Sequence, residues 1–413
     1  MTMPLEGVRV LDLSAVWAGP FGTRLLADYG AEVLKVESPR QWDQLRALGG
    51  IPRTEPRWYN RSGYFNHNNR NKSAFALDLR SDLGRETLLQ LAAVSDVFIE
   101  NFRADVTDKL RLSYEDVRAV NPAIIYVSMP GHGKTGPEKD FVAYGSNVEQ
   151  LSGLVSLSGY EGGEPMKTGI SYGDPMAGTA LVAAVALALR RRRLTGEGGY
   201  VELAQRESLM SFVGEALVDY SLNGIERPPI GNRHPHLAPH NCYRSAGEDA
   251  WVTIACENDA QFAALCRVIE RPDLAVDPRF ATNAARKANE ADLDAEIDRW
   301  SSARGHYEAM FLLQRAGVPA GAVLTIPELM ADPHFRARGA WVEQTHVDAG
   351  TWEMEAPPWK LSRTPGGIRL SAPGFAEHNS YVFRDVLHLD DEYIARLYAE
   401  GVTSDDPDET AHM

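Results

Sequence analysis

Hydrophobic and polar positions in the first 130 residues follow two alternating patterns. Short apolar runs, typical of buried strands, occupy residues 8–13, 31–36, 73–79, 96–100 and 123–128. Segments with apolar residues at helical spacing lie between them, at residues 20–29, 84–93 and 114–120. This alternation predicts an α/β fold: a doubly wound, Rossmann-like large domain with helices on both faces of a parallel sheet.

The pattern changes after this region. Residues 225–330 combine a strand at 251–255 with several helical segments, which predicts a smaller α+β domain. Beyond it, antiparallel strands are expected between residues 341 and 362, a helix over 382–397, and a disordered acidic tail from 404 to 413. The predicted boundaries are therefore 1–224 for the first part of the large domain, 225–330 for the small domain, and 331–413 for a return to the large domain.

One loop and one helix stand out. Residues 40–70 are aromatic and rich in Asn, without periodicity, and long loops of this kind are usually functional. Gly173-Asp174-Pro175 precedes the apolar run 175–189, which is closed by four arginines and predicts a buried helix. Pro175 suits the first helical position, so Asp174 is the predicted N-cap, with a carboxylate kept ionised by free N–H groups. An ordinary helix cap would have the same sequence.

Composition and charge exclude several classes. The chain has 413 residues, 44% of them hydrophobic, and a net charge of −15, which argues against nucleic-acid or anionic-membrane partners. The three cysteines, Cys242, Cys256 and Cys266, lack metal-ligand spacing and suit free thiols in a reducing cytoplasm. The N-terminus does not resemble a signal peptide, and the apolar run of about 15 residues is too short to span a membrane. A cytoplasmic location is predicted.

The turn after the first strand also narrows the choice. Residues 17–22 contain glycines but not the G-x-G-x-x-G spacing of a dinucleotide site. A nicotinamide-dependent dehydrogenase is therefore poorly supported.

Several short motifs occur in a consistent order along nearly the whole chain. They include PLEGVRVLDLS at 4–14, AGPF at 18–21, LLADYGAEVLKVE at 25–37 and GD at 173–174. Together they resemble the class III CoA-transferases, the CaiB/BaiF family that contains formyl-CoA transferase and carnitine CoA-transferase.

The resemblance implies a reaction and a nucleophile. In this family the Asp that matches Asp174 attacks an acyl-CoA, and an aspartyl-CoA thioester forms through mixed anhydrides. The implied substrates are coenzyme A as an acyl-CoA donor, with succinyl-CoA as a candidate, and a carboxylic acid acceptor. No metal is implied, and the sequence shows no ligand cluster for one.

The resemblance also implies a binding site and an assembly. Positions that match those lining the family's CoA cleft are Trp17, Ala18, Leu77, Arg80, Asn101, Phe102, Lys109 and Tyr144, with Arg40 as a nearby phosphate ligand. The family fold further implies a homodimer of two interlocked, ring-like chains.

The sequence departs from formyl-CoA transferase at the expected acid site. Trp17 replaces a Gln, and Gly145 replaces a Glu that follows the Tyr matching Tyr144. The family's run of glycines is absent; residues 237–242 read LAPHNC, which makes His240 and Asn241, together with Gly145, candidate substrate contacts. These changes predict an acceptor larger than formate or oxalate.

Two alternatives remain. An α-methylacyl-CoA racemase shares the fold, but it needs a second acid/base group, and the position of its Gly-His-Asp triplet reads Ala143-Tyr144-Gly145. A non-catalytic CoA-binding subunit of a hetero-oligomer would be expected to lose the nucleophile, whereas Asp174 is present.

Overall fold

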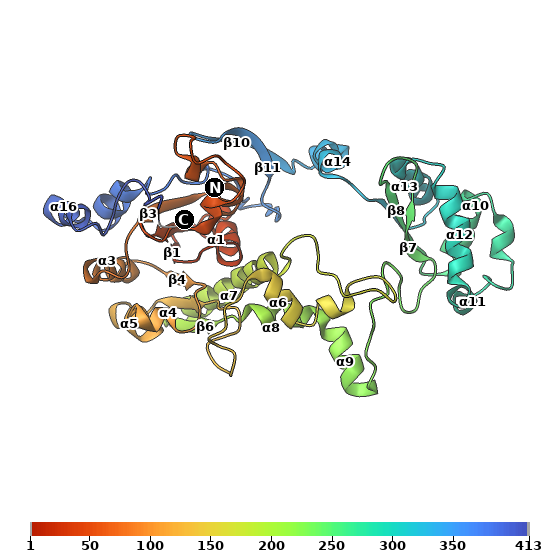
Figure 1. Cartoon of the computed structure of the whole chain (residues 1–413), viewed down its shortest axis with the longest axis horizontal. Coiled ribbons are helices and arrows are strands. Elements are labelled where there is room, and N and C mark those ends of the chain that lie inside the picture. Colours follow the sequence, from red (N-terminus) through yellow and green to blue (C-terminus); the bar gives the residue numbers. More distant parts are fainter. Residues whose placement is uncertain (1, 411–413) are drawn as a thin grey trace. The chain divides into compact units, whose positions relative to one another are not determined.

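The apolar runs of the N-terminal half form the strands of one parallel sheet (Figure 1). The computed structural model describes residues 2–410. Its parallel strands are β1 (Arg9–Asp12), β2 (Glu32–Glu37), β3 (Lys72–Ala76), β4 (Val97–Glu100), β5 (Ile125–Ser128) and β6 (Gly199–Glu202). Within the described residues their order is β3-β2-β1-β4-β5-β6, the order of the doubly wound Rossmann fold, which confirms the predicted α/β sheet.

Helices cover both faces of this sheet. Neighbouring residues of a strand point to opposite faces, so Val10 and Leu11 belong to different cores. Leu11 packs in one cluster with α3 (Asp82–Ala93) and α5 (Tyr114–Val120). Val10 packs in the other with α1 (Ala18–Asp28) and α7 (Gly173–Thr195). Burial on both faces explains why these strands are continuously apolar rather than alternating.

The chain divides into two units. The first contains the parallel sheet and consists of the residues up to Leu154, Lys167–Ile225 and the stretch from Ala337 onward. Its other elements are η1 (Gln44–Ala47), η2 (Trp58–Asn60), α2 (Gly63–Asn69), α4 (Val106–Lys109), α6 (Gly145–Leu151), α8 (Gln205–Met210), η4 (Ser211–Val213), α9 (Gly214–Asn223), β10 (Trp341–His346), β11 (Gly350–Glu355), the π-helical η6 (Tyr381–Val386) and α16 (Asp391–Ala399).

The second unit consists of Val155–Met166 and Glu226–Arg336. An antiparallel sheet in the order β7-β8-β9 packs with helices around one hydrophobic core. The elements of this part of the chain are η3 (Val155–Leu157), β7 (His240–Arg244), β8 (Trp251–Ala255), α10 (Asp259–Val268), η5 (Pro272–Ala275), α11 (Asn283–Ala288), α12 (Glu290–Ser301), α13 (His306–Arg315), β9 (Ala320–Ala322), α14 (Ile326–Ala331) and α15 (Pro333–Ala337). Cys256 and Cys266 are buried free thiols, and Cys242 is half-buried.

Two predictions about the secondary structure of the first unit were wrong. The stretch 40–70 is not irregular throughout, because Ser62 caps the helix α2 by accepting a hydrogen bond from the Phe65 N–H at 3.4 Å. The helix expected over 382–397 is interrupted, since His388 has a φ of 54°, which no α-helix accommodates. Asp390 then caps α16 through the Tyr393 N–H at 2.7 Å.

The acidic tail is also more ordered than its composition suggested. The Tyr59 hydroxyl donates to Asp406 Oδ1 at 2.8 Å, and Trp58 Nε1 donates to Glu409 Oε2 at 2.8 Å. These polar side chains of η2 tie the acidic segment down as far as residue 410, whereas residues 411–413 of the predicted tail lie outside the described part.

Two glycines bring α1 and α7 into close contact. A Cβ atom at Gly22 would lie 2.6 Å from the Gly178 carbonyl oxygen, and a Cβ atom at Gly178 would lie 2.6 Å from the Ala18 carbonyl oxygen. Real side chains do not approach backbone so closely, so the helices can pack in this way because both positions lack a side chain. Ala18 precedes Gly22 by one helical turn, and Asp174 precedes Gly178 by one turn. The glycine contact therefore sets how closely the first turns of the two helices approach.

We predict that Gly178→Ala lowers the unfolding temperature by several degrees. The new methyl group would meet backbone atoms, and overpacking of this kind costs about 1–3 kcal/mol, more than the roughly 1 kcal/mol gained in helix propensity. Gly214→Ala in α9 is the matched control, because a Cβ atom there would meet nothing within 4 Å. Thermal unfolding followed by circular dichroism measures both. Equal or higher stability of Gly178→Ala would contradict the packing argument.

Candidate active site

Asp174 lies in the first turn of α7 but does not cap the helix. The helix begins at Gly173, so Asp174 is its second residue, and the predicted N-cap role was wrong. The reason is that another group serves the helix start: the Gly173 N–H donates to Glu149 Oε1 at 3.0 Å. The first free N–H of the helix is thus satisfied by a carboxyl group from α6.

The surroundings of Asp174 favour its protonated form. Its side chain is buried, with 9% of the residue exposed. Burial, followed by the nearby charge of Glu149, raises the pKa of Asp174 to about 7, against the opposing effect of a hydrogen bond from the Ala18 backbone. The expectation that the helix N-terminus keeps this carboxyl fully ionised was therefore wrong. Desolvation outweighs the helix dipole and the single hydrogen bond here.

Gly145 lies directly against this carboxyl group. A Cβ atom at Gly145 would lie 1.9 Å from Asp174 Oδ2 and 2.7 Å from its Cγ. The absence of a side chain at the start of α6 is therefore what lets the Asp174 carboxyl occupy its position. Gly145, a predicted substrate contact, is therefore directly beside Asp174.

A cavity of about 540 Å³ opens at the carboxyl ends of β1 to β4. Four of the residues predicted for CoA binding line it: Leu77, Arg80, Phe102 and Lys109. The strand order reverses between β1 and β4, and ligands of doubly wound proteins bind outside the carboxyl ends at this point. Leu77 and Phe102 supply apolar surface, and Arg80 and Lys109 supply positive charge.

The other residues predicted to bind CoA lie elsewhere in the first unit. Ala18 opens α1 beside Asp174, and the Asn101 side chain holds the loop before α1 through the Ala15 N–H at 2.9 Å and the Ala15 carbonyl at 2.8 Å. Trp17 precedes α1, contacts Tyr64 edge-on at 6.2 Å, and lines a separate cavity of about 440 Å³. Arg40 and Tyr144 are exposed, Arg40 beside cavity-lining residues and Tyr144 immediately before α6.

His240 and Asn241 belong to the second unit. His240 Nδ1 contacts the Asn232 carbonyl at 2.9 Å, and Asn241 Nδ2 donates to Asp294 at 3.1 Å. Asn241 also lines a cavity of about 530 Å³ within that unit.

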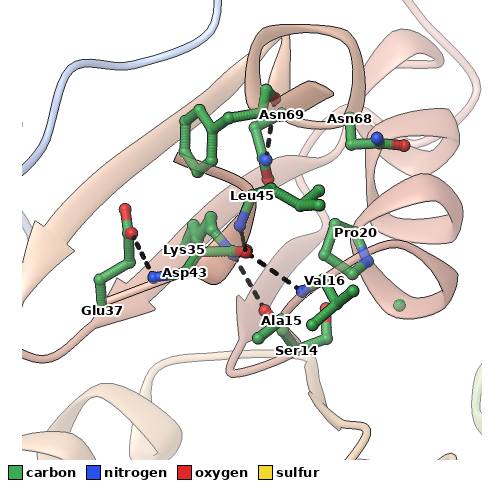
Figure 2. A network of polar contacts seen from close by, with 12 residues as sticks. Ser14, Ala15, Val16, Pro20, Lys35, Glu37, Asp43, Leu45, Asn68 and Asn69 are labelled. Carbon is green, nitrogen blue, oxygen red and sulfur yellow. Dashed lines mark hydrogen bonds and ion pairs between the residues drawn. The ribbon is translucent and has the colours of Figure 1, made fainter. Parts of the chain in front are cut away.

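A buried ion pair fixes the loop between β1 and α1 (Figure 2). Lys35 Nζ donates to Asp43 Oδ2 at 2.9 Å and to the Ser14 carbonyl at 2.9 Å. Asp43 Oδ1 accepts from the Val16 N–H at 3.2 Å and the Leu45 N–H at 3.0 Å. Val16 has a φ of 67°, a strained value for a β-branched residue, and these bonds hold it there.

A second buried ion pair, Lys72–Asp12, contacts the same loop through Asp12. Lys72 Nζ donates to Asp12 Oδ2 at 3.1 Å, and Asp12 also accepts from the Ser14 N–H at 3.0 Å. Burial would raise the pKa of Asp12, but the charges of Lys72 and Lys35 hold it below its ordinary value. Burial lowers the pKa of Lys72 to about 8. Neither ion pair was predicted from the sequence, although charged residues inside continuously apolar strands were a usable signal.

Membrane-spanning helices and metal-ligand clusters are both absent from the described part of the chain. Between residues 2 and 410, no helix is both long enough and apolar enough to cross a bilayer. The same residues contain no group of three His, Cys, Asp or Glu side chains placed to hold a metal ion.

A parallel sheet with a cavity at its switch point and a buried carboxyl group at a helix start defines an enzyme-like site of the doubly wound α/β class. The family follows from sequence comparison: residues 5–379 match the family model described as CoA-transferase family III, and the chain belongs to this family. The resemblance inferred from the motifs is thereby confirmed. The chain is a CoA-transferase, and enzymes of this type act on CoA thioesters.

Named relatives cover nearly the whole chain. It is 35% identical to succinyl-CoA–D-citramalate CoA-transferase of Chloroflexus aurantiacus, over 97% of this chain and 98% of the relative. It is 34% identical to acetyl-CoA:oxalate CoA-transferase of Acetobacter aceti, over 90% and 94%. Among solved structures, a CAIB/BAIF family protein from Brucella suis matches with a TM-score of 0.85 at 33% identity, covering 94% of this chain and all of that one.

We predict that Asp174→Asn stabilises the protein more at pH 8 than at pH 5. With a folded-state pKa of about 7 against 3.8, the folded chain holds a proton that the unfolded chain has lost between these values. The free energy of unfolding of the wild type therefore falls by up to about 4 kcal/mol as the pH rises through this window. The neutral amide of Asp174→Asn does not titrate, so the variant does not lose this stability. Unfolding temperatures at the two pH values measure it, with the exposed Asp385→Asn as control. A pH-independent difference would contradict the burial argument.

Proposed function

We propose that this CoA-transferase moves CoA from an acyl-CoA donor to a carboxylic acid through covalent intermediates on Asp174. The observation that carries the proposal is the buried Asp174 carboxyl at the start of α7, with a pKa of about 7 and the Ala18 backbone as its hydrogen-bond partner. A carboxyl group of this pKa is ionised in a substantial fraction of molecules at neutral pH. Because it is poorly hydrated, its ionised form is a better nucleophile than an exposed aspartate.

The steps keep electrons and protons in balance. The ionised Asp174 attacks the thioester carbonyl, a C–O bond forms, the C–S bond breaks, and CoA leaves as a thiolate. The thiolate attacks the Asp174 carbonyl of this anhydride, which releases the donor acid and leaves aspartyl-CoA. The acceptor carboxylate then attacks the aspartyl-CoA thioester and releases the thiolate. The thiolate attacks the acceptor carbonyl of the new anhydride, which forms the new acyl-CoA and regenerates the Asp174 carboxylate. The Ala18 backbone, which already donates a hydrogen bond to the Asp174 carboxyl, is a suitable donor to the developing oxyanions.

The cavity at the carboxyl ends of β1 to β4 is the proposed CoA site. Arg80 and Lys109 would meet the phosphates, and Leu77 and Phe102 would provide flat apolar surface for the rest of the molecule. The loop from Ser14 to Val16 lines this cavity, and Ala18 follows it two residues later beside Asp174. A continuous stretch of backbone thus runs from the cavity to the nucleophile.

Succinyl-CoA is the proposed donor, supported by the name of the relative from Chloroflexus aurantiacus. The names of the two relatives include both a larger acid, D-citramalate, and oxalate as acceptor. We propose an acceptor larger than formate or oxalate, because Trp17 lines a cavity of about 440 Å³ together with Tyr64 and His67. His240 and Asn241 stay as further proposed substrate contacts.

We predict that succinyl-CoA labels Asp174. The purified protein is incubated with succinyl-CoA and then treated with hydroxylamine or borohydride, and peptide mass spectrometry locates the modification. Asp174→Ala should lose the label and at least about 1000-fold of the transferase rate, as expected for loss of a nucleophile. If Asp174 stayed unmodified while a chiral 2-methylacyl-CoA exchanged its α-proton with solvent, the covalent route would be wrong and a racemase-type reaction would replace it. If Asp174 is labelled, the labelled wild-type protein is screened with acids of increasing size.

A homodimer is the proposed assembly. Large apolar side chains of the first unit are exposed between residues 141 and 222, among them Phe141 at 57%, Leu187 at 72% and Leu222 at 77%. Within the described chain, α9 has no buried residue at all. Apolar surface of this extent usually marks a protein interface.

We predict a particle of twice the chain mass of 45.5 kDa in size-exclusion chromatography with light scattering. If the two chains interlock, dilution should not produce folded monomers, because separating the chains requires unfolding. Leu222→Glu places a charge on the exposed face of α9 and should reduce the dimer yield, whereas Val347→Glu, at an exposed turn between β10 and β11, is the control. A monomer at micromolar concentration would contradict the proposal.

A further inference from the structure

Helix α6 meets the first turn of α7 at two points on one face. Gly145 and Glu149 are four residues apart, so they lie one above the other on the helix surface. Gly145 leaves room for the Asp174 carboxyl, and Glu149 Oε1 accepts the Gly173 N–H at 3.0 Å. The Asp174 carboxyl and Glu149 therefore both lie at the contact between these two helices.

Glu149 is an unusual residue for a structural role alone. It is fully buried, and its second oxygen, Oε2, has no hydrogen-bond partner among the residues that the structure describes. A fully buried carboxyl group with an unpaired oxygen is costly to keep for packing alone. Among the charged groups that the structure describes, Glu149 is the one that raises the pKa of Asp174 in addition to burial.

The other charged groups on the neighbouring helices are engaged elsewhere. On α1, Arg24 pairs with Glu355 at 2.7 Å and Asp28 with Arg70 at 2.8 Å. On α8, Arg206 pairs with Glu138 and donates to the Leu151 carbonyl at 2.9 Å, and Glu207 is exposed. Glu202 at the end of β6 accepts the Lys134 N–H at 2.7 Å, and the arginines of α7 lie at its far end. In the described chain, no cation pairs with Asp174 or Glu149.

We propose that Glu149 sets the pH at which Asp174 becomes a nucleophile in the free enzyme. Two neighbouring carboxyl groups without a cation cannot both ionise easily, so the charge of Glu149 favours the protonated form of Asp174. Asp174 attacks the thioester only after it has lost its proton to solvent, so a variant without a charge at residue 149 should react at lower pH. Glu149 is a positioning residue in this scheme, which rests on the proposed function.

The test compares Glu149→Gln, Glu149→Ala and wild type. Glutamine keeps the shape and can still accept the Gly173 N–H, but it has no charge; alanine also loses the acceptor. The rate of Asp174 labelling by succinyl-CoA is measured from pH 5 to pH 9. We expect wild type to reach half its maximal rate near pH 7, and both variants to reach it at least one pH unit lower, with a reduced maximum in the alanine variant. Glu197→Gln, an exposed change at the other end of α7, should leave the midpoint in place.

An unchanged midpoint in Glu149→Gln would overturn the proposal, whatever the rate, because a merely structural role changes the level and not the pH dependence. If wild type is never labelled, the proposed function has failed, and the effect of Glu149 on Asp174 is tested without activity. Unfolding temperatures at pH 8 are then measured for Asp174→Asn, Glu149→Gln and the double variant. A gain in the double variant smaller than the sum of the single gains would support coupling, and additive gains would refute it.

Discussion

The close approach of α1 and α7 at Gly22 and Gly178 is the constraint on which the site depends. Any side chain at either position would meet backbone of the opposite helix, so the distance between the two helix axes is fixed by the absence of two methyl groups. One turn earlier, the same spacing brings the Ala18 backbone to the Asp174 carboxyl. A small change in packing at the glycines would therefore be transmitted directly to the hydrogen bond that Asp174, the proposed nucleophile, accepts from the Ala18 backbone.

Two opposing effects act on Asp174, and their sizes decide its protonation. A helix N-terminus stabilises a carboxylate by about 0.3–1 kcal/mol, or about 2 kcal/mol when partly buried. Burial of a carboxyl group can raise its pKa by several units, each worth about 1.4 kcal/mol. With Glu149 nearby and no compensating cation among the described residues, burial prevails and the pKa of Asp174 reaches about 7. A fully exposed Asp at the same helix start would be ionised but hydrated, and less reactive.

The fold could be predicted from the sequence further than the site could. Continuous apolar runs separated by helical spacing were enough for the parallel sheet, because every strand at its centre is buried on both faces. Asp174 was found through motifs, and Leu77, Arg80, Phe102 and Lys109 line one cavity. Glu149 could not be found, since its role comes from a contact between two helices. The protonation of Asp174 was misjudged for the same reason: burial by α1 and α6 is a tertiary property.

The β1–α1 loop links the cavity at the switch point to Asp174, the proposed nucleophile. Its residues Ser14 to Val16 line the cavity, and α1 begins beside Asp174 immediately afterwards. Such a loop must keep its shape when a ligand binds, and Val16, with a φ of 67°, would not adopt its conformation unaided. The buried Lys35–Asp43 and Lys72–Asp12 pairs meet this need, because each charge is satisfied by a partner and by backbone groups of the loop or its surroundings. Removing one partner would leave a buried charge unpaired, which costs far more than losing a surface ion pair. The two buried pairs therefore keep the loop rigid beside the proposed nucleophile.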